Sequence, residues 1–93
     1  MHPIIEEYIA FSPGSAALAK RAASVFPGGD TRASAHYGPY PLAMDHAEGC
    51  ILTDVDGHQI IDFMNNFTSL VHGHTFPAVV EAVQTQIAQG SAY

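Results

Sequence analysis

The chain has 93 residues, a net charge of −6 and a charged fraction of only 13%. Its three Lys and Arg residues do not form the basic clusters that neutralise phosphate groups, so nucleic acid and anionic membrane surfaces are excluded as expected partners. The single Cys excludes an intramolecular disulfide and favours a cytoplasmic location, and no apolar stretch approaches the roughly 20 residues that span a bilayer.

Two helices are predicted at the start of the chain, where residues 1–27 are expected to form a helical arm. The apolar side chains of residues 3–10 fall on one side of a helical wheel, which predicts a short amphipathic helix. Ser15 is expected to cap a second, Ala-rich helix that runs to about Phe26. Pro27 and the two glycines after it are expected to end this helix, because proline removes a backbone donor and glycine accepts a left-handed stop.

Residues 28–41 are predicted to form a loop rich in polar and aromatic side chains, and long loops of this kind are more often functional than filler. Arg32 is the first candidate in it, because a planar guanidinium matches a carboxylate through two parallel hydrogen bonds. The alternative is a surface ion pair between Arg32 and Asp30, which would contribute little to stability. The sequence by itself leaves both interpretations open.

Residues 42–64 predict a three-stranded antiparallel meander. Asp56 and Gly57 give a strong hairpin signal between the second and third strands, and residues 48–49 give a weaker turn between the first and second. With Asp54, these residues share only the beginning of a calcium-binding loop, without its later ligands, so they are expected to shape the turn. The predicted strands cover residues 42–44, 50–53 and 59–64.

An irregular polar segment follows, and then a helix predicted over residues 75–89. Thr75 is expected to cap this helix, and Pro77 lies in its first turn, where proline is tolerated. Gly90 is expected to end it. Its apolar face is formed by Val79, Val80, Val83 and Ile87.

The irregular segment contains an aromatic residue and two histidines of interest. Phe67 is either the aromatic wall of a pocket or a core residue, and core is the usual place for such a side chain. His72 and His74 would share a metal ion if they lay on a strand, with a third ligand from Asp62 or His58. The stronger alternative is that one histidine bonds to the backbone at the helix entrance, so no metal site is predicted.

Five segments of the chain occur in an order and spacing that resemble the N-terminal segment of class III aminotransferases, which are pyridoxal-phosphate enzymes of fold type I. Within that class they are most similar to glutamate-1-semialdehyde aminomutases and to aminotransferases of β-amino acids such as β-phenylalanine. The resemblance runs from about Ser15 to Gly90. The segments are FPGGDTR at 26–32, YPLAM at 40–44, AEGCILTDVDG at 47–57, IDF at 61–63 and GHTFPAVVEAV at 73–83.

The resemblance implies an α+β segment with N-terminal helices, a meander and a final helix, which opens a larger α/β enzyme of fold type I. It implies that Arg32 binds a substrate carboxylate and that Phe67 lines the same pocket, with Ser34 also facing it. The aminomutases have Trp at the position of Phe67, and some β-amino-acid enzymes have Tyr. Phe67 keeps the wall without a polar group that bonds to substrate.

The resemblance also implies a homodimer that moves an amino group between amino acids and keto acids. A lysine of the complete enzyme would hold pyridoxal phosphate as a Schiff base. Lys20, the only lysine here, matches no cofactor position, and the large cofactor domain is absent. Residues 1–93 are therefore predicted to be inactive alone and to pack on the remainder of their own polypeptide.

A second hypothesis comes from a different class of protein. Low charge and apolar helix faces are also expected of a free-standing small α+β module that binds a partner or oligomerises without chemistry of its own. Such a module should unfold in one cooperative transition.

Overall fold

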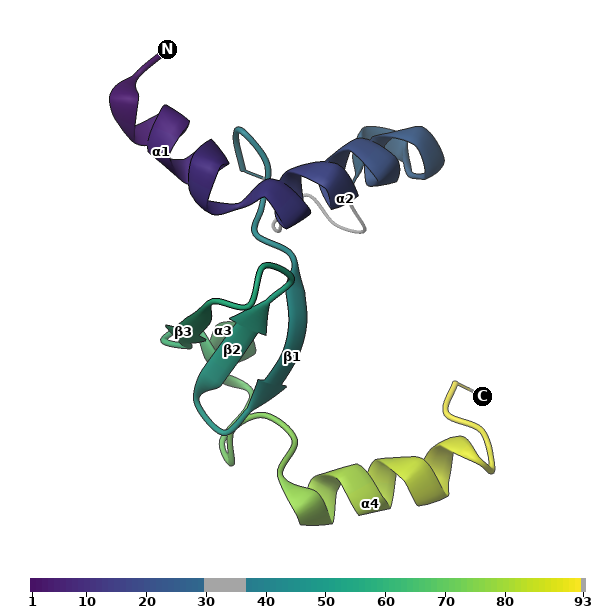
Figure 1. Ribbon diagram of the computed structural model, residues 1–93. Helices are drawn as coiled ribbons and strands as arrows, with labels where there is room; N and C mark the ends of the chain where they lie inside the picture. Colours follow the sequence, from purple (N-terminus) through teal and green to yellow (C-terminus); the bar gives the residue numbers. More distant parts are fainter. Residues whose placement is uncertain (30–36, 93) are drawn as a thin grey trace.

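The structure is a computed structural model that describes residues 1–29 and 37–92. Figure 1 shows the N-terminal helices at one end of the chain, a small sheet in the middle and the last helix at the far end. The elements are α1 (Pro3–Phe11), α2 (Pro13–Val25), the 3-10 helix η1 (Pro27–Gly29), β1 (Met44–Glu48), β2 (Ile51–Asp54), β3 (Gln59–Ile61), α3 (Asn65–Thr68) and α4 (Pro77–Ile87).

The two N-terminal helices begin at prolines, whose fixed φ suits a first helical turn. The imidazole of His2 caps α1 by accepting the Ile4 amide at 3.2 Å. The prediction that Ser15 caps α2 is wrong, because α2 already begins at Pro13. Ser15 is buried inside the first turn, and its hydroxyl accepts the amide of Ala43 at 2.9 Å.

The three strands form one antiparallel sheet in the order β1-β2-β3, which confirms the predicted meander and fold class. The first strand lies at 44–48 rather than at the predicted 42–44, because side-chain hydroxyls take the amides of Leu42 and Ala43. The third strand ends at Ile61 rather than at residue 64. Beyond it, the carboxylate of Asp62 accepts two backbone amides and turns the chain away from the sheet.

The last helix, α4, follows a short connection after the sheet. The prediction that Thr75 caps α4 is wrong, because Phe76 occupies the cap position and makes no side-chain cap bond. Thr75 has a positive φ of 52°, and its hydroxyl instead donates to the carbonyl of Ala47 at 3.2 Å. Among the described elements, α4 makes no extensive packing contact with another helix or strand (Figure 1).

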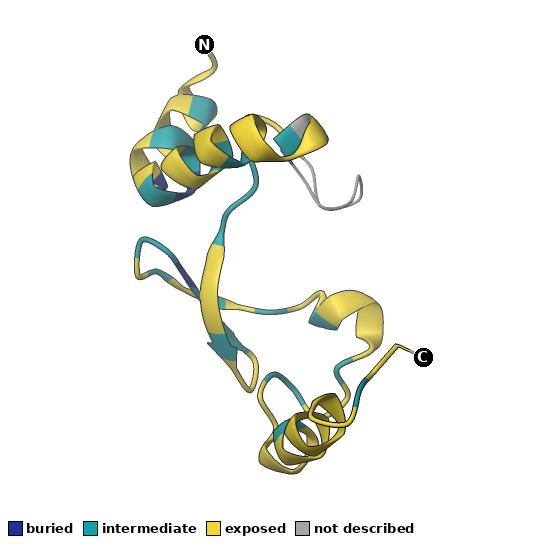
Figure 2. Cartoon of the chain, turned by 90° about the vertical axis from the view of Figure 1, so that its right-hand side faces the viewer, coloured by how far each residue is buried: buried dark blue, intermediate teal, exposed yellow. Residues whose placement is uncertain are grey.

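The chain has no apolar core within the described residues. The only buried residues there are polar: Ser12, Ser15 and Asp54. Figure 2 shows most of each helix, and nearly all of α4, exposed. The radius of gyration is 15.8 Å, whereas a compact domain of this length has about 12 Å. The exposed area is 7192 Å², against roughly 5,200 Å² for a compact monomer of this mass.

This openness leaves apolar side chains on every described helix without a covering layer. Because burial of apolar surface is the main force that stabilises a fold, these elements need further polypeptide against them. The residues concerned include Ile4, Phe11, Leu18, Val25, Val79, Val83 and Ile87.

Candidate functional site

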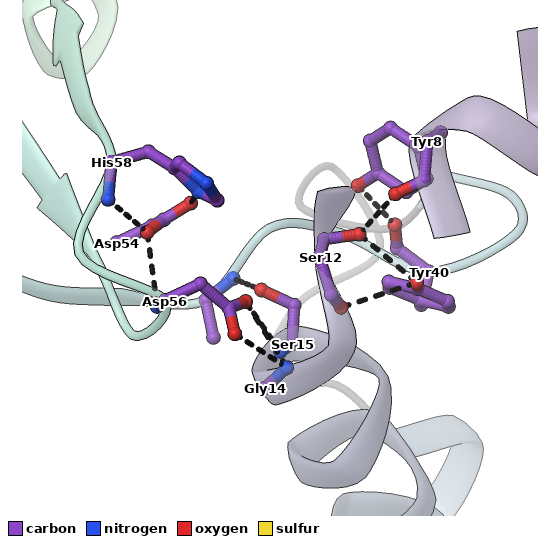
Figure 3. A network of polar contacts seen from close by, with 9 residues as sticks. Tyr8, Ser12, Gly14, Ser15, Tyr40, Asp54, Asp56 and His58 are labelled. Carbon is purple, nitrogen blue, oxygen red and sulfur yellow. Dashed lines mark hydrogen bonds and ion pairs between the residues drawn. The ribbon is translucent and has the colours of Figure 1, made fainter. Parts of the chain in front are cut away.

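A network of polar contacts joins the two N-terminal helices to the sheet, and we call it the arm joint (Figure 3). It contains all three of the buried residues found in the described part of the chain. Because these contacts link residues 28 to 42 positions apart, the joint fixes how the helices sit relative to the hairpin. Its residues are Tyr8, Ser12, Gly14, Ser15, Tyr40, Asp54, Asp56 and His58.

Asp56, in the β2–β3 turn, caps the start of α2. Its carboxylate accepts the amide of Gly14 at 2.8 Å and 3.1 Å, and the amide of Ser15 at 3.4 Å. A carboxylate here is favourable because the N-terminus of a helix carries partial positive charge. A Cβ added at Gly14 would lie 2.7 Å from Oδ1 of Asp56, so a larger residue there would displace the capping carboxylate.

Asp54 organises the same turn from inside. One carboxylate oxygen accepts the amides of Asp56 and His58, and the other lies 2.8 Å from Nδ1 of His58. Burial would raise the pKa of the Asp54 carboxyl, but the bonds from His58 and from the Asp56 amide hold this pKa below its ordinary value. The expectation that the aspartates shape the turn is therefore confirmed. The His58 ring also stacks on Phe11, with ring centroids 3.7 Å apart.

The other half of the joint holds the chain that leads into β1. The hydroxyl of Tyr8 donates to the carbonyl of Tyr40 at 2.7 Å, and burial raises the pKa of this hydroxyl. Ser12 donates to the Tyr8 carbonyl and lies 3.0 Å from the Tyr40 hydroxyl. The joint thus fixes the residues that follow the segment containing Arg32 and Ser34. Those two predicted substrate-binding residues lie outside the described residues.

A second organised region is residues 62–74, which we call the clasped loop. Its ends are brought together by Asp62 and His74, whose Oδ2 and Nε2 atoms lie 2.6 Å apart. The amide of Asn65, the His74 ring and the amide of Met64 hold the pKa of the Asp62 carboxyl below its ordinary value against partial burial. Two backbone hydrogen bonds between His74 and Gly49, at 2.9 Å and 3.0 Å, tie the same end to the sheet.

Phe67 lies in the clasped loop on an unusual turn, α3. Four successive residues, 65–68, have positive φ between 48° and 68°, so the turn is left-handed. Left-handed backbone costs roughly 1–2 kcal/mol for each residue that is not glycine, and Asn tolerates it best. Such strain persists where the surrounding contacts leave no alternative, which is typical of functional sites. The turn holds the Phe67 side chain 64% exposed.

The two histidines of this region do not converge. His74 pairs with Asp62, whereas the ring of His72 stacks on Phe76 with centroids 4.7 Å apart. In the part of the chain that the structure describes, no group of three or more His, Cys, Asp or Glu side chains is arranged to hold a metal ion. The expectation that one histidine side chain bonds to the backbone at the helix entrance is wrong, because the His74 ring pairs with a carboxylate and only the main chain of His74 bonds to the backbone of Gly49.

The contacts that build the two regions carried no local signal in the sequence. Asp56 and Gly14 are 42 positions apart, and Asp62 and His74 are 12 apart. The sequence drew attention only to the Asp56-Gly57 turn and to the Gly73-His74 pair, in which two of these residues lie.

The described helices include none long and apolar enough to cross a membrane.

Comparison with known proteins places these regions in a family. A model of the family described as Aminotransferase class-III matches residues 32–93. A glutamate-1-semialdehyde 2,1-aminomutase from Methanopyrus kandleri is 43% identical over 81 residues, which are 87% of this chain and 19% of that protein. These matches confirm the resemblance predicted from the sequence.

Solved structures give the same result for the fold. A structure described as a transaminase with PLP bound has a TM-score of 0.79 and 43% identity, and the match covers 88% of this chain and 19% of that one. A β-phenylalanine aminotransferase from Variovorax paradoxus has a TM-score of 0.84 and 31% identity, with 92% and 20% covered. The chain therefore spans about a fifth of the length of the proteins it matches.

Proposed function

Since this chain belongs to the class III aminotransferase family, we propose that it forms the N-terminal, substrate-side part of an enzyme that moves an amino group on a carboxylate-bearing amino acid. The complete enzyme would be an aminotransferase or an aminomutase. The observation that carries this proposal is the family match over residues 32–93, which includes the arm joint's Tyr40 and the whole clasped loop.

We propose that the complete enzyme uses pyridoxal phosphate. The described residues do not fit this cofactor by themselves. Lys20 is exposed on α2, away from the clasped loop, and the chain has no other lysine to form a Schiff base. The residues that bind the cofactor would belong mainly to the rest of the polypeptide, so residues 1–93 alone would be inactive.

The substrate contacts that we propose are Arg32, Ser34 and Phe67. Arg32 would bind the substrate carboxylate through its guanidinium, and Ser34 would face the same pocket. Phe67 would form an apolar wall, and its exposure on a strained turn supports this role. Because Phe67 has no hydroxyl or indole N–H, the wall would bind substrate through apolar contact alone.

The partners that we propose follow from the same family. The exposed apolar faces of α1, α2 and α4 would pack on the remainder of the polypeptide and near the interface of a homodimer in the cytoplasm. A free-standing binding module is the alternative. The lack of any buried apolar side chain among the described residues supports the first proposal, because a module that stands alone needs a core.

The role of Arg32 is tested in the complete enzyme with two matched amines. β-Phenylalanine carries a carboxylate, and 1-phenylpropylamine has the same ring and amine with an ethyl group in place of the carboxymethyl group. Arg32→Ala should raise KM for β-phenylalanine by at least about tenfold, because a charge-assisted hydrogen bond contributes roughly 1.5–3 kcal/mol. KM for 1-phenylpropylamine should change less than about twofold.

The matched control for this test is Arg21→Ala, which removes an exposed arginine of α2. It should leave both KM values unchanged. Equal increases in KM for the two amines in Arg32→Ala would exclude the carboxylate-binding role.

A further inference from the structure

One carboxylate makes the side-chain bonds that close the clasped loop, beside the backbone bonds that its two ends make to Cys50 and Gly49. Asp62 lies 2.6 Å from His74 through Oδ2, and its Oδ1 accepts the amides of Met64 and Asn65, each at 2.9 Å. The Asp62 side chain is 10% exposed and that of His74 is 22% exposed, so water competes little for this pair. The carboxylate therefore fixes the start of the left-handed turn, and its pair with His74 joins the two ends of the loop in addition to their backbone bonds to the sheet.

Polar contacts rather than apolar packing hold the left-handed turn in the described part of the chain. Asn66 and Phe67 are exposed, and their neighbours Thr68 and Ser69 are exposed too. The bonds within the turn include those between Ser69 and Asn66 and those from the amides of Ser69 and Leu70 to the Asn65 carbonyl. Among the described residues, the side-chain bonds that join the turn to the start of the loop come from Asp62, whose other carboxylate oxygen pairs with His74.

The direction of Phe67 depends on this arrangement. If residues 65–68 returned to ordinary backbone with negative φ, the Cα–Cβ bond of Phe67 would point elsewhere. Asp62 and His74 bond to each other and to the backbone rather than to the Phe67 side chain, so any effect on that side chain acts through the backbone of the turn.

We propose that Asp62 and His74 are positioning residues for the substrate pocket: their pair holds the left-handed turn and so aims Phe67 at the side chain of the substrate. This inference rests on the proposed function, because it requires Phe67 to contact substrate. It assigns to the Asp62–His74 pair a role in selecting substrates with an apolar side chain.

The kinetic test compares β-phenylalanine, which carries a phenyl group, with β-alanine, which does not, in the complete enzyme. His74→Ala should raise KM for β-phenylalanine at least tenfold. It should change kcat for β-phenylalanine, and KM for β-alanine, by less than about twofold. His74→Gln keeps a donor for Asp62 and should recover most of the loss. Equal changes for both substrates would overturn the proposal.

A double-mutant cycle separates positioning from a general structural role. If the pair acts through Phe67, His74→Ala should add less than about twofold to KM in a Phe67→Ala enzyme. If the increases in KM from His74→Ala and Phe67→Ala multiply in the double variant, the pair acts independently of Phe67. The matched control is His46→Ala, which breaks the exposed Asp45–His46 pair on β1 and should leave every constant unchanged.

A spectroscopic measurement tests whether the pair positions Phe67 without relying on activity, so that its outcome is distinguishable from a failure of the proposed function. 4-Fluorophenylalanine placed at position 67 should give one ¹⁹F line, which shifts or splits in His74→Ala and stays unchanged in His46→Ala. If His74→Ala does not fold, Asp62→Asn gives the same readout at smaller amplitude, and His74→Gln, which keeps a donor for Asp62, should leave the line near its original position. An unchanged line in a folded variant that lacks the pair would overturn the proposal.

Discussion

Replacement of Asp56 by alanine is expected to loosen the start of α2. Pro13 has no amide hydrogen, and the amide of Ala16 already bonds to the Ser12 carbonyl at 3.1 Å. The two remaining free amides of the first turn, those of Gly14 and Ser15, both point to the Asp56 carboxylate. The whole cap of α2 therefore depends on one side chain that lies about 40 residues away in sequence.

The expected loss of helix stability follows from the usual cost of removing a capping side chain. Loss of a capping side chain costs about 1 kcal/mol, within a range of roughly 0.5–2 kcal/mol. One kcal/mol corresponds to about a fivefold change in an opening equilibrium, and local opening governs amide hydrogen exchange. Exchange in the first turn of α2 should therefore be about fivefold faster in Asp56→Ala, whereas exchange in β1 and β2 should not change.

The assay is amide hydrogen exchange of the complete polypeptide, followed by mass spectrometry of peptides from α2. Asp56→Asn keeps an acceptor but loses the charge that the helix N-terminus favours, so it should fall between the parent and Asp56→Ala. Asp45→Ala, at an exposed aspartate of β1, is the matched control. Equal exchange in Asp56→Ala and Asp45→Ala would refute the assignment of the cap.

Three further outcomes are expected at the arm joint. Gly14→Ala should destabilise the parent protein, because the new Cβ would lie 2.7 Å from Oδ1 of Asp56. In the Asp56→Ala variant that clash is gone, so the same substitution should stabilise the protein through the higher helix propensity of alanine. Thermal unfolding of the parent, the two single variants and the double variant tests this. The depressed pKa of the Asp54 carboxyl stabilises the fold at pH values above the ordinary carboxyl pKa of about 4. This stability is lost as the pH falls through the lower pKa of the folded state. Melting temperatures measured from pH 7 to pH 3 should therefore fall more steeply in the parent protein than in Asp54→Asn. Tyr8→Phe removes the donor to the Tyr40 carbonyl and should cost about 1 kcal/mol, measured by chemical denaturation of the complete polypeptide.

The features that the sequence predicted well are those set by neighbouring residues. The Asp56-Gly57 turn was recognisable because Gly57 adopts a φ of 86°, which other residues avoid. The apolar period and the flanking prolines located the N-terminal helices and α4 to within a few residues. Local signals of this kind also predicted the order and antiparallel pairing of the strands.

The features that the sequence did not predict depend on partners far along the chain. Ser15 looked like a cap, but the cap is supplied by Asp56 from a turn 41 positions later. The third strand was predicted to continue, but the carboxylate of Asp62 competes for the backbone amides. A left-handed turn through Phe67 and Thr68 could not be predicted, because neither residue favours that backbone by itself.

The candidate site was predicted by family resemblance rather than by local pattern. Phe67 stands exposed on the clasped loop within the described part of the chain, and its role as a pocket wall stays a prediction. The roles of Arg32 and Ser34 stay predictions. The Asp62–His74 pair was considered only as a set of metal ligands, because its pairing across the loop is a property of the fold.

The most direct test of the proposed function is the absorption spectrum of bound pyridoxal phosphate. The complete polypeptide, purified with the cofactor, should show the cofactor's visible absorption band, and addition of β-phenylalanine should convert it to the band of the amine form. Residues 1–93 alone should show neither the bound cofactor nor the conversion. A complete polypeptide that binds no pyridoxal phosphate, or residues 1–93 that carry out the conversion unaided, would contradict the assignment of this chain as the substrate-side part of a larger aminotransferase.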